Sequence, residues 1–388
     1  MAIDEKLKII IAGDFSPIGR TEKLFLVREY NKVYGDVLSE LKENDIIVTN
    51  LETPLTTERN PLMKTGPCLH ANPETIEGIK FAGFNVLTLA NNHILDQGER
   101  GLLKTLDICS SSKIQTVGAG KNISEATQPL IIERKGKKVA ILNFAENEFS
   151  IATENTAGAN PLNVVDNYYQ LYSVKDKSDV VLVIIHGGHE LYNLPSPRMQ
   201  DISRFFVDIG ANAIIWHHAH IFSGVEMYKN IPIFYGLGNF IFDLPNVKFN
   251  RWHEGYLVKL IIDENNSVSY DLIPYKRNEE FFGIRLLNEN EKELFKKEIS
   301  ELSEIIRNRE ILNEKWECYA RKLSNSYLSF LTVRTRITRF LLKLSKIRKF
   351  LLEEKRILAI LNFIRCESHR DVLVYTLEKY LKDINEKE

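Results

Sequence analysis

Short apolar runs, each about the length of a buried strand, recur from residue 7 to about residue 275. Helix-like stretches such as Glu74–Phe81, Arg100–Cys109 and Arg198–Ile209 stand between several of them. Strands that alternate with helices predict an α/β fold, with a largely parallel sheet covered on both faces. The predicted buried strands are Leu7–Ala12, Asp45–Thr49, Asn85–Ala90, Lys138–Phe144, Val180–His186, Ala213–Trp216 and Pro232–Tyr235.

Two later apolar runs are joined by a short polar connection and not by a helix-like stretch. Tyr256–Ile262 and Ser267–Ile273 are separated only by a polar stretch that begins at Asp263. A connection this short and polar predicts a β-hairpin, whose strands are antiparallel. We therefore expect mixed sheets rather than purely parallel ones.

Nearly every predicted strand in the first 220 residues runs into polar residues that can bind a metal ion. In such sheets the carboxyl ends of the strands carry the loops that hold chemistry, whereas an unpaired buried charge in a strand interior costs several kcal/mol. Five strand ends at one sheet edge are followed by potential metal ligands, and this predicts a shared site. The residues in question are Asp14 after the first strand, Glu52 after the second, Asn91, Asn92 and His93 after the third, His186, His189 and Glu190 after the fifth, and His218 and His220 after the sixth.

The chemistry of these side chains narrows the metal. Imidazole, carboxylate and amide oxygen suit borderline or hard divalent ions such as Mn, Fe or Zn, and no cysteine stands close by in the sequence. His218 and His220 form the strongest local signal, because residues i and i+2 of an extended segment project to the same side. A bridging carboxylate would suit two ions, which together activate water and bind a transferring phosphoryl group.

Five sequence blocks resemble, in order and spacing, those of the bacterial capsule-synthesis CapA family. This family, also called the poly-γ-glutamate capsule biosynthesis proteins, belongs to the calcineurin-like metallophosphoesterase superfamily. The resemblance covers roughly residues 7–275 and implies a metallophosphoesterase-like sandwich of mixed β-sheets flanked by helices. The blocks read GDFSPIG, TNLETPLT, GFNVLTLANNHILDQGERGLLKTLD, IIHGGHEL and HHAHIFSGVEMYKNIPIFYGLGNFIFD.

The resemblance also implies a role for each matched position. Asp14 and His220 would bind the first metal ion, and Glu52 would bridge the two ions. Asn92, His186 and His218 would bind the second. His93 would be the general acid that protonates a leaving oxygen.

The chain departs from the superfamily pattern mainly at the first metal. Ser16 stands where a histidine is usual, and Glu52 replaces a bridging aspartate. The first ion would then bind weakly or recruit His189 or Glu190 instead. Asn239 belongs to a GLGNF signature near the end of the last block and is a further candidate, and the glycines of that signature would let backbone approach the pocket.

Substrate contacts are harder to assign. Several side chains could meet an anionic substrate or line the pocket, but each also fits as an ordinary surface, capping or edge-strand residue. The basic candidates are Arg20, Lys64, His70 and Arg251, and the candidate lining is Trp252, His253 and Glu254.

From about residue 285 glycine and proline are absent, and the chain becomes rich in Leu, Ile, Lys, Arg and Glu. We expect a domain over residues 1–284 and a helical C-terminal appendage over 285–388. Within the appendage, residues 336–351 predict a basic amphipathic helix. Its apolar face could dock on neighbouring helices or on a second copy of the chain, or the helix could bind a membrane surface or an acidic polymer.

A formal net charge of −1 over 388 residues gives no overall attraction to nucleic acid, so we expect no such partner. The N-terminal segment has acids before a short apolar run, unlike a secretory signal. No run reaches the roughly 18 apolar residues of a membrane span. These features predict a cytoplasmic protein, with peripheral membrane association open through residues 336–351.

Two functions remain open at this point. One is a metal-dependent hydrolase of a phosphoester or a related anionic bond, in which a glutamyl amide is a variant substrate. The other is a non-hydrolytic accessory protein that binds an anionic polymer during capsule synthesis or export. In either case the partner is an anionic small molecule or polymer.

Overall fold

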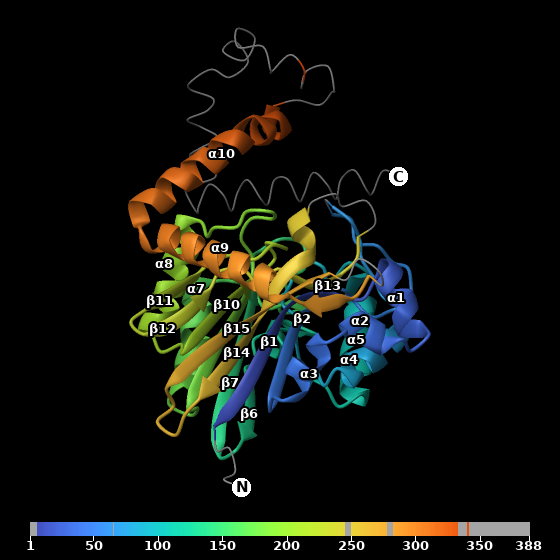
Figure 1. Ribbon diagram of the computed structural model, residues 1–388. Helices are drawn as coiled ribbons and strands as arrows, with labels where there is room; N and C mark the ends of the chain where they lie inside the picture. Colours follow the sequence, from blue (N-terminus) through green and yellow to red (C-terminus); the bar gives the residue numbers. More distant parts are fainter. Residues whose placement is uncertain (1–5, 65, 245–249, 278–281, 333–339, 341–388) are drawn as a thin grey trace. The chain divides into compact units, whose positions relative to one another are not determined.

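The computed structural model describes residues 6–64, 66–244, 250–277, 282–332 and 340 (Figure 1). The chain divides into two compact units, the first ending at Asn313 and the second beginning at Glu314. The first unit contains both large sheets and every site discussed below. In the second unit, the structure describes the greater part of helix α10, Arg309–Thr332.

The larger sheet has eight strands in the order β16-β15-β14-β1-β2-β3-β4, and β13 also pairs with β1. Strands β1 to β4 are parallel, while β14, β15 and β16 continue the sheet in antiparallel fashion. The strands are β1 (Leu7–Ser16), β2 (Ile46–Leu51), β3 (Val86–Thr88), β4 (Gln115–Val117), β13 (Asn239–Phe242), β14 (Glu254–Ile262), β15 (Val268–Arg277) and β16 (Ile284–Leu286).

The second sheet has six strands in the order β11-β12-β10-β9-β7-β6. Its centre, β7-β9-β10-β12, is parallel, and β6 and β11 are antiparallel edges. A separate pair, β5 (Ala119–Gly120) and β8 (Gly158–Ala159), is antiparallel. The six strands are β6 (Leu130–Arg134), β7 (Lys137–Ala145), β9 (Val180–His186), β10 (Ala213–His217), β11 (Val225–Tyr228) and β12 (Ile231–Phe234).

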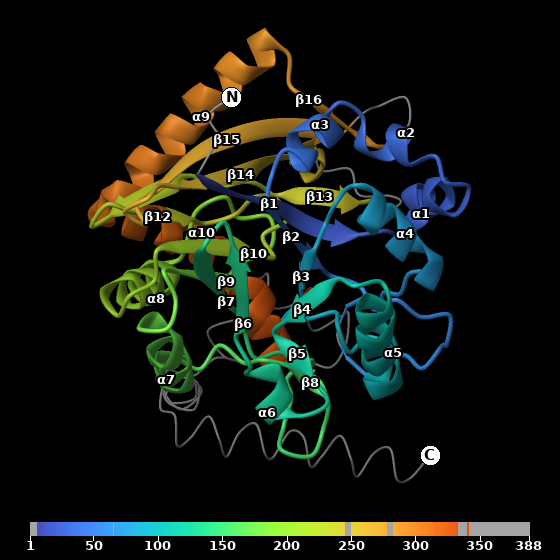
Figure 2. The ribbon, with the colours of Figure 1, turned by 90° about the horizontal axis from the view of Figure 1, so that it is seen from below.

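Helices cover the outer faces of the two sheets (Figure 2). In strand β1, Ile9 and Ile11 belong to the core shared with the six-stranded sheet, whereas Ile10 and Ala12 pack toward the helices. Successive side chains of a strand point to opposite faces, which explains why β1 is apolar at consecutive positions from Ile9 to Ala12. The helices are α1 (Gly19–Leu26), α2 (Tyr30–Tyr34), α3 (Val37–Lys42), α4 (Ile76–Phe81), α5 (Gly98–Ser111), α6 (Ile123–Ala126), α7 (Val164–Lys175), α8 (Pro197–Asp208) and α9 (Glu289–Arg307), with 3-10 turns at Pro73–Thr75 and Asn250–His253.

The predicted fold class is confirmed: mixed sheets face each other between helices, and a helical segment follows. The predicted hairpin is also present, because β14 and β15 pair in antiparallel register from Glu254 with Lys276 to Ile262 with Val268. The edge strands β6 and β11 were not predicted. Their exposed faces interrupt the apolar run that marks a buried strand.

Strand β13, also unpredicted, lies parallel to the end of β1 and pairs Asn239 with Asp14. The carbonyl oxygen of Gly238 accepts a hydrogen bond from the Asp14 amide at 3.1 Å, and Gly238 has a φ of 79°. A Cβ atom at Gly13 would lie 1.9 Å from that oxygen, so only glycine fits there. The expectation that glycines of this signature permit a close backbone approach therefore has a structural basis.

Helix α9 packs on the core of the first unit through Phe295, Leu302 and Ile306, which are all buried. Asn288 and Glu291 form a capping box at its start, which fixes where the helix begins. The domain boundary was expected after residue 284. Helix α9 follows that position but belongs to the first unit, whose last residue is Asn313.

We expect Ile306→Ala to lower the free energy of unfolding by about 2–5 kcal/mol, because it leaves a cavity beneath α9. Leu294→Ala on the same helix is the control, since Leu294 is 70% exposed. Its effect should stay within about 0.5 kcal/mol. Urea unfolding curves of the full chain measure both, and equal effects would contradict the packing described here.

Of the described residues, no helix combines the length and the apolar character that crossing a bilayer requires. The amphipathic helix predicted over 336–351 lies outside the described residues except for Phe340. Its partners therefore remain predictions.

Candidate metal centre

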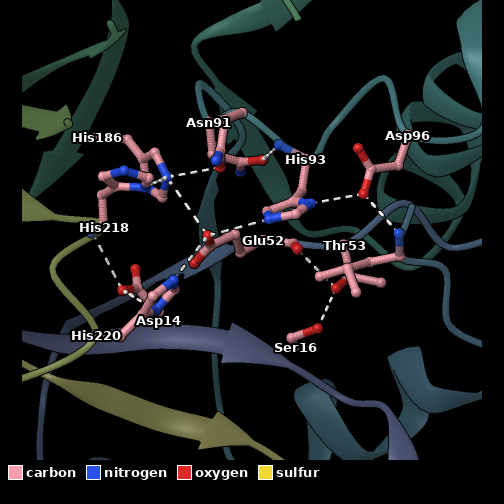
Figure 3. Close-up of polar contacts among 12 residues, drawn as sticks. Asp14, Ser16, Glu52, Thr53, Asn91, His93, Asp96, His186, His218 and His220 are labelled. Carbon is pink, nitrogen blue, oxygen red and sulfur yellow. Dashed lines mark hydrogen bonds and ion pairs between the residues drawn. The ribbon is translucent and has the colours of Figure 1, made fainter. Parts of the chain in front are cut away.

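The polar residues predicted from the strand ends meet where the carboxyl ends of the two sheets face each other (Figure 3). Asp14 lies near the end of β1, and Glu52 follows β2 directly. His186 is the last residue of β9, and His218 is the first residue after β10. Residues more than 200 positions apart therefore share one buried cluster.

Two groups of potential ligand atoms share Glu52. Ligand atoms of Glu52, His186 and His218 lie within 4.8 Å of one another, and so do those of Asp14, Glu52 and His220. All five side chains are buried. The two groups correspond to the two metal positions that the resemblance implies, with the carboxylate of Glu52 between them.

The side chain of Glu52 lacks hydrogen-bond partners in the cluster. It is fully buried, and neither carboxylate oxygen has a hydrogen-bond partner. Its Oε1 lies 3.5 Å from His186 Nε2 and 3.7 Å from His220 Nε2. Burial, together with the negative charges of Asp14, Glu190 and Asp96, raises its pKa well above the ordinary value. A buried carboxylate with no donor is costly unless a cation accompanies it, so this site fits a metal ion.

Asp14 is well satisfied by comparison. Asn50 Nδ2 donates to its Oδ1 at 2.9 Å, and the backbone amide of His218 donates to Oδ2 at 3.2 Å. His217 and His220 each bring Nδ1 within 3.4 Å of this carboxylate. Burial alone would raise the pKa of Asp14, but contacts with these two imidazoles outweigh burial and lower the pKa well below normal. Asp14 is therefore an anion at neutral pH.

Three side chains meet on the far side of Glu52. His186 Nε2 lies 3.0 Å from Asn92 Oδ1 and 3.1 Å from His218 Nδ1. Burial lowers the pKa of His186 well below its usual value, and burial together with the charge of His220 lowers that of His218 to about 3. Both imidazoles are thus neutral at pH 7, which is the form that binds metals.

Asn239 orients His220. Its Oδ1 lies 3.0 Å from His220 Nδ1, and its Nδ2 donates to the carbonyl oxygens of His220 and Trp252. With Nδ1 occupied in this way, Nε2 of His220 faces Glu52. Asn239 was a candidate ligand in the sequence, but the structure places it behind another candidate ligand, His220. Side chains in this position fix the tautomer of a metal-binding histidine.

His93 lies at the edge of the cluster with its ring held from behind. Its Nδ1 lies 2.6 Å from Asp96 Oδ2, and Nε2 lies 4.0 Å from Glu52 Oε1. Lys64 forms an ion pair with Asp96 and also contacts His93 Nδ1 at 3.2 Å. Burial lowers the pKa of His93, although the hydrogen bond to Asp96 opposes this. The free Nε2 is therefore directed toward the space in front of Glu52.

Three further candidates have different surroundings. The Ser16 hydroxyl is hydrogen-bonded to that of Thr53. Glu190 is exposed, but its carboxylate lies within 4.8 Å of ligand atoms of His218 and His220. His189 is partly buried, which lowers its pKa, and it is in none of the groups of ligand atoms among the described residues. Of the two predicted substitutes for the missing histidine, the geometry favours Glu190.

Several residues of the site were missed by sequence reasoning. His217, between Trp216 and His218, lies 3.2 Å from Asp14, and Asn50 bridges Asp14 and His186. Glu148 follows β7 and brings Oε1 within 3.9 Å of His218. Asn50 and His217 occupied strand ends, so the rule that located Glu52 and His218 could have included them. Glu148 follows a strand whose end carried no histidine, and nothing in the sequence marked it.

Of the side chains considered for substrate contact, some are paired with other residues of the chain and one lines the site. His70 is hydrogen-bonded to Arg59, and Arg251 is paired with Glu298 of α9. Lys64 is almost completely buried against Asp96. Arg20 is partly exposed and paired with Asp243. Trp252 does line the site, since its ring lies 4.7 Å from that of His220.

Comparison with known proteins identifies a family and individual proteins that are similar to this chain over the region that contains the site. A family described as bacterial capsule synthesis protein PGA_cap matches residues 8–244, which include every residue of the cluster. A capsule biosynthesis protein CapA of Bacillus anthracis is 33% identical over 282 residues, covering 70% of this chain and 67% of that protein.

Two further relatives show similar extents. A PGA biosynthesis protein CapA of Bacillus subtilis is 28% identical over 275 residues, covering 70% of this chain and 72% of that protein. A probable polyglutamine synthesis accessory protein of Mycobacterium tuberculosis is 24% identical over 255 residues, covering 62% of this chain and 67% of that protein.

Proposed function

Because this chain belongs to the bacterial capsule synthesis protein family PGA_cap, as its motifs predicted, we propose that it serves the synthesis of an anionic capsule polymer as a hydrolase with two divalent metal ions. The bond cleaved would be a phosphoester or a related anionic bond. Manganese, iron and zinc suit the imidazole and carboxylate ligands.

The unpartnered carboxylate of Glu52 is the observation that supports this proposal most directly. Both of its oxygens are buried and without a donor, yet Glu52 belongs to two groups of ligand atoms. A single cation would satisfy one group, whereas two cations on either side of Glu52 would satisfy both. Asp14 and His220 would hold one ion, and Asn92, His186 and His218 the other.

The chemistry then divides between the ions and the chain. Bound divalent ions supply Lewis acidity, which makes water a better nucleophile and stabilises negative charge on a phosphoryl or acyl group. His93 is the residue placed for proton transfer. Asp96 accepts a hydrogen bond from the N–H at Nδ1 of His93. When His93 is protonated, its second proton would therefore be on Nε2, which faces Glu52. His93 would donate this Nε2 proton to the leaving oxygen.

Metal analysis and turnover of the full chain test this function together. The chain, purified without chelator, should contain about two ions by elemental analysis and cleave a chromogenic phosphomonoester or phosphodiester. Chelation should abolish turnover, and Mn²⁺ or Zn²⁺ should restore it. A chain that binds one ion or none after metal addition would contradict the dinuclear site.

A non-hydrolytic accessory role is the second candidate. The Ser16 hydroxyl is held by Thr53, where the superfamily usually places a metal-binding histidine, and this favours a site that retains metal without turnover. One of the relatives is itself named an accessory protein. Bound metal and polymer binding, with no cleavage of phosphoester or glutamyl amide substrates, would favour this role.

A further inference from the structure

Two arginines meet around one buried carboxylate next to the candidate metal centre. Arg20 of α1 donates from Nε to Asp243 Oδ2 at 2.8 Å and from Nη2 to Oδ1, and its backbone amide also donates to Oδ2. Arg277, at the end of β15, approaches the same carboxylate at 3.7 Å. Segments more than 200 residues apart therefore bring two guanidinium groups to one acid.

The charge of this arrangement is not balanced. Asp243 is 3% exposed, and the hydrogen bonds and charge of Arg20 lower its pKa despite burial, so it carries one negative charge. His253 lies 2.9 Å from Arg277 Nη1, and burial together with Arg277 lowers its pKa to about 4. At neutral pH the histidine adds no charge. Among the described residues of this cluster, two guanidinium groups and one carboxylate leave a net positive charge.

The two guanidinium groups are held in place before any ligand arrives. Arg20 lies 3.9 Å and Arg277 4.8 Å from the centre of the Phe282 ring. The Arg20 side chain is 41% exposed and that of Arg277 18% exposed, so both can be reached from solvent. A guanidinium has more N–H donors than one carboxylate occupies. Donors fixed in this way lose little entropy when they bind an anion.

Arg277 and Asp243 of this cluster share a cavity with two residues that contact the candidate metal ligand His220. One small cavity is lined by Asn239, Asp243, Trp252, His253, Arg277 and Phe282. Asn239 orients His220, and the Trp252 ring packs on His220. An anionic group held by the arginines would thus be separated from the metal ligands by about one aromatic side chain.

We propose that Arg20 and Arg277 form a subsite that binds an anionic group of the substrate beside the group that lies at the metal centre. The inference rests on the proposed function in that it assigns this group to the same substrate. A polymer that carries an anion on each repeating unit would occupy both positions at once. Carboxylate and phosphate share the required chemistry, because a guanidinium binds either in bidentate fashion.

Isothermal titration of the chelator-treated full chain tests the subsite without turnover. The probes are a short synthetic oligomer of γ-linked glutamate and inorganic tripolyphosphate. Arg277→Gln should weaken binding of the preferred probe by about tenfold to a hundredfold. Arg251→Gln is the matched control, since Arg251 is also paired with a carboxylate, that of Glu298 on α9. Equal affinities of the two variants would overturn the inference.

Asp243→Asn tests the charge balance in the opposite direction. It keeps the shape of the side chain and releases both guanidinium groups from their counter-ion, so affinity for the probe should rise about tenfold. If circular dichroism shows that Arg277→Gln does not fold, the affinity of Asp243→Asn tests the subsite instead. Unchanged or weaker binding of the probe by Asp243→Asn would overturn the subsite. Preference for the glutamate oligomer would identify carboxylate as the bound group, and preference for tripolyphosphate would identify phosphate.

Metal content and turnover, measured on the same preparations before chelator treatment, separate this inference from the proposed function. Two bound ions with turnover, but anion binding insensitive to Arg277, would overturn the subsite alone. Absence of metal and turnover, with anion binding that depends on Arg277, would contradict the proposed hydrolase and support the subsite.

Discussion

Replacing Glu52 with glutamine is expected to lower the metal content of the chain from about two ions to one or none. Glu52 is the one side chain common to the two groups of ligand atoms that include Asp14 and His186. A glutamine keeps the shape but removes the negative charge that two cations would share. Elemental analysis after dialysis against a metal-buffered solution gives the stoichiometry directly.

The effect of Glu52→Gln on the stability of the chain should change sign when metal is removed. With metal at a thousandfold excess over its Kd, binding stabilises the wild-type fold by about 4 kcal/mol, and the Glu52→Gln variant loses most of this. In chelator, the wild type buries the carboxyl group of Glu52 without a donor, and burial together with the nearby negative charges disfavours its charged form, a cost that the neutral variant avoids. The variant should therefore melt below the wild type with metal and above it without.

Glu226→Gln provides a contrasting control. Glu226 is buried as well, but it is paired with Arg204 and accepts a hydrogen bond from Tyr235 at 2.7 Å. Its replacement should destabilise the chain both with and without chelator and leave the metal content unchanged. If Glu52→Gln behaved in the same way as Glu226→Gln, the carboxylate of Glu52 would not be a metal ligand.

Replacing His93 with alanine is expected to lower turnover by about a hundredfold to ten-thousandfold, the range typical of losing a general acid. Metal content should stay at the wild-type level, because His93 is in none of the ligand groups among the described residues. Steady-state kinetics on a chromogenic phosphodiester, with elemental analysis of the same preparation, measures both quantities.

Two further variants make this result specific. Asp96→Asn should lower turnover less than His93→Ala, because the ring remains but its Nδ1 loses the carboxylate 2.6 Å away. Asn92→Ala should instead lower metal content, since Asn92 Oδ1 lies beside His186. Wild-type turnover in His93→Ala would exclude His93 from the reaction.

The fold was largely predictable because its core strands are buried on both faces. Val180–His186 was predicted with the bounds that β9 has in the structure, and the hairpin of β14 and β15 was also expected. Strands with an exposed face, such as β6 and β11, lack that continuous apolar pattern and were missed. Helix α9 was expected as part of an appendage, yet its apolar stripe packs on the first unit's core.

The candidate site shows the same division between residues. Parallel strands bring their carboxyl ends to one edge, so Asp14, Glu52 and His186 could be grouped from their positions at strand ends. The roles of Asn239, Asp96 and Lys64 depend on which side chain faces which atom across the site. Strand order and side-chain direction are not local properties of the sequence, and no spacing rule supplies them.

The sequence by itself determined the family, the α/β class and the set of strand-end residues, because these follow from apolar periodicity and from motifs that are local in the chain. Only the tertiary structure decided that Glu52 lacks a donor, that Asn239 supports His220, and that Arg20 and Arg277 share Asp243. These properties arise from burial and from contacts between residues far apart in sequence, and burial is what makes an unpaired charge costly enough to require a cation.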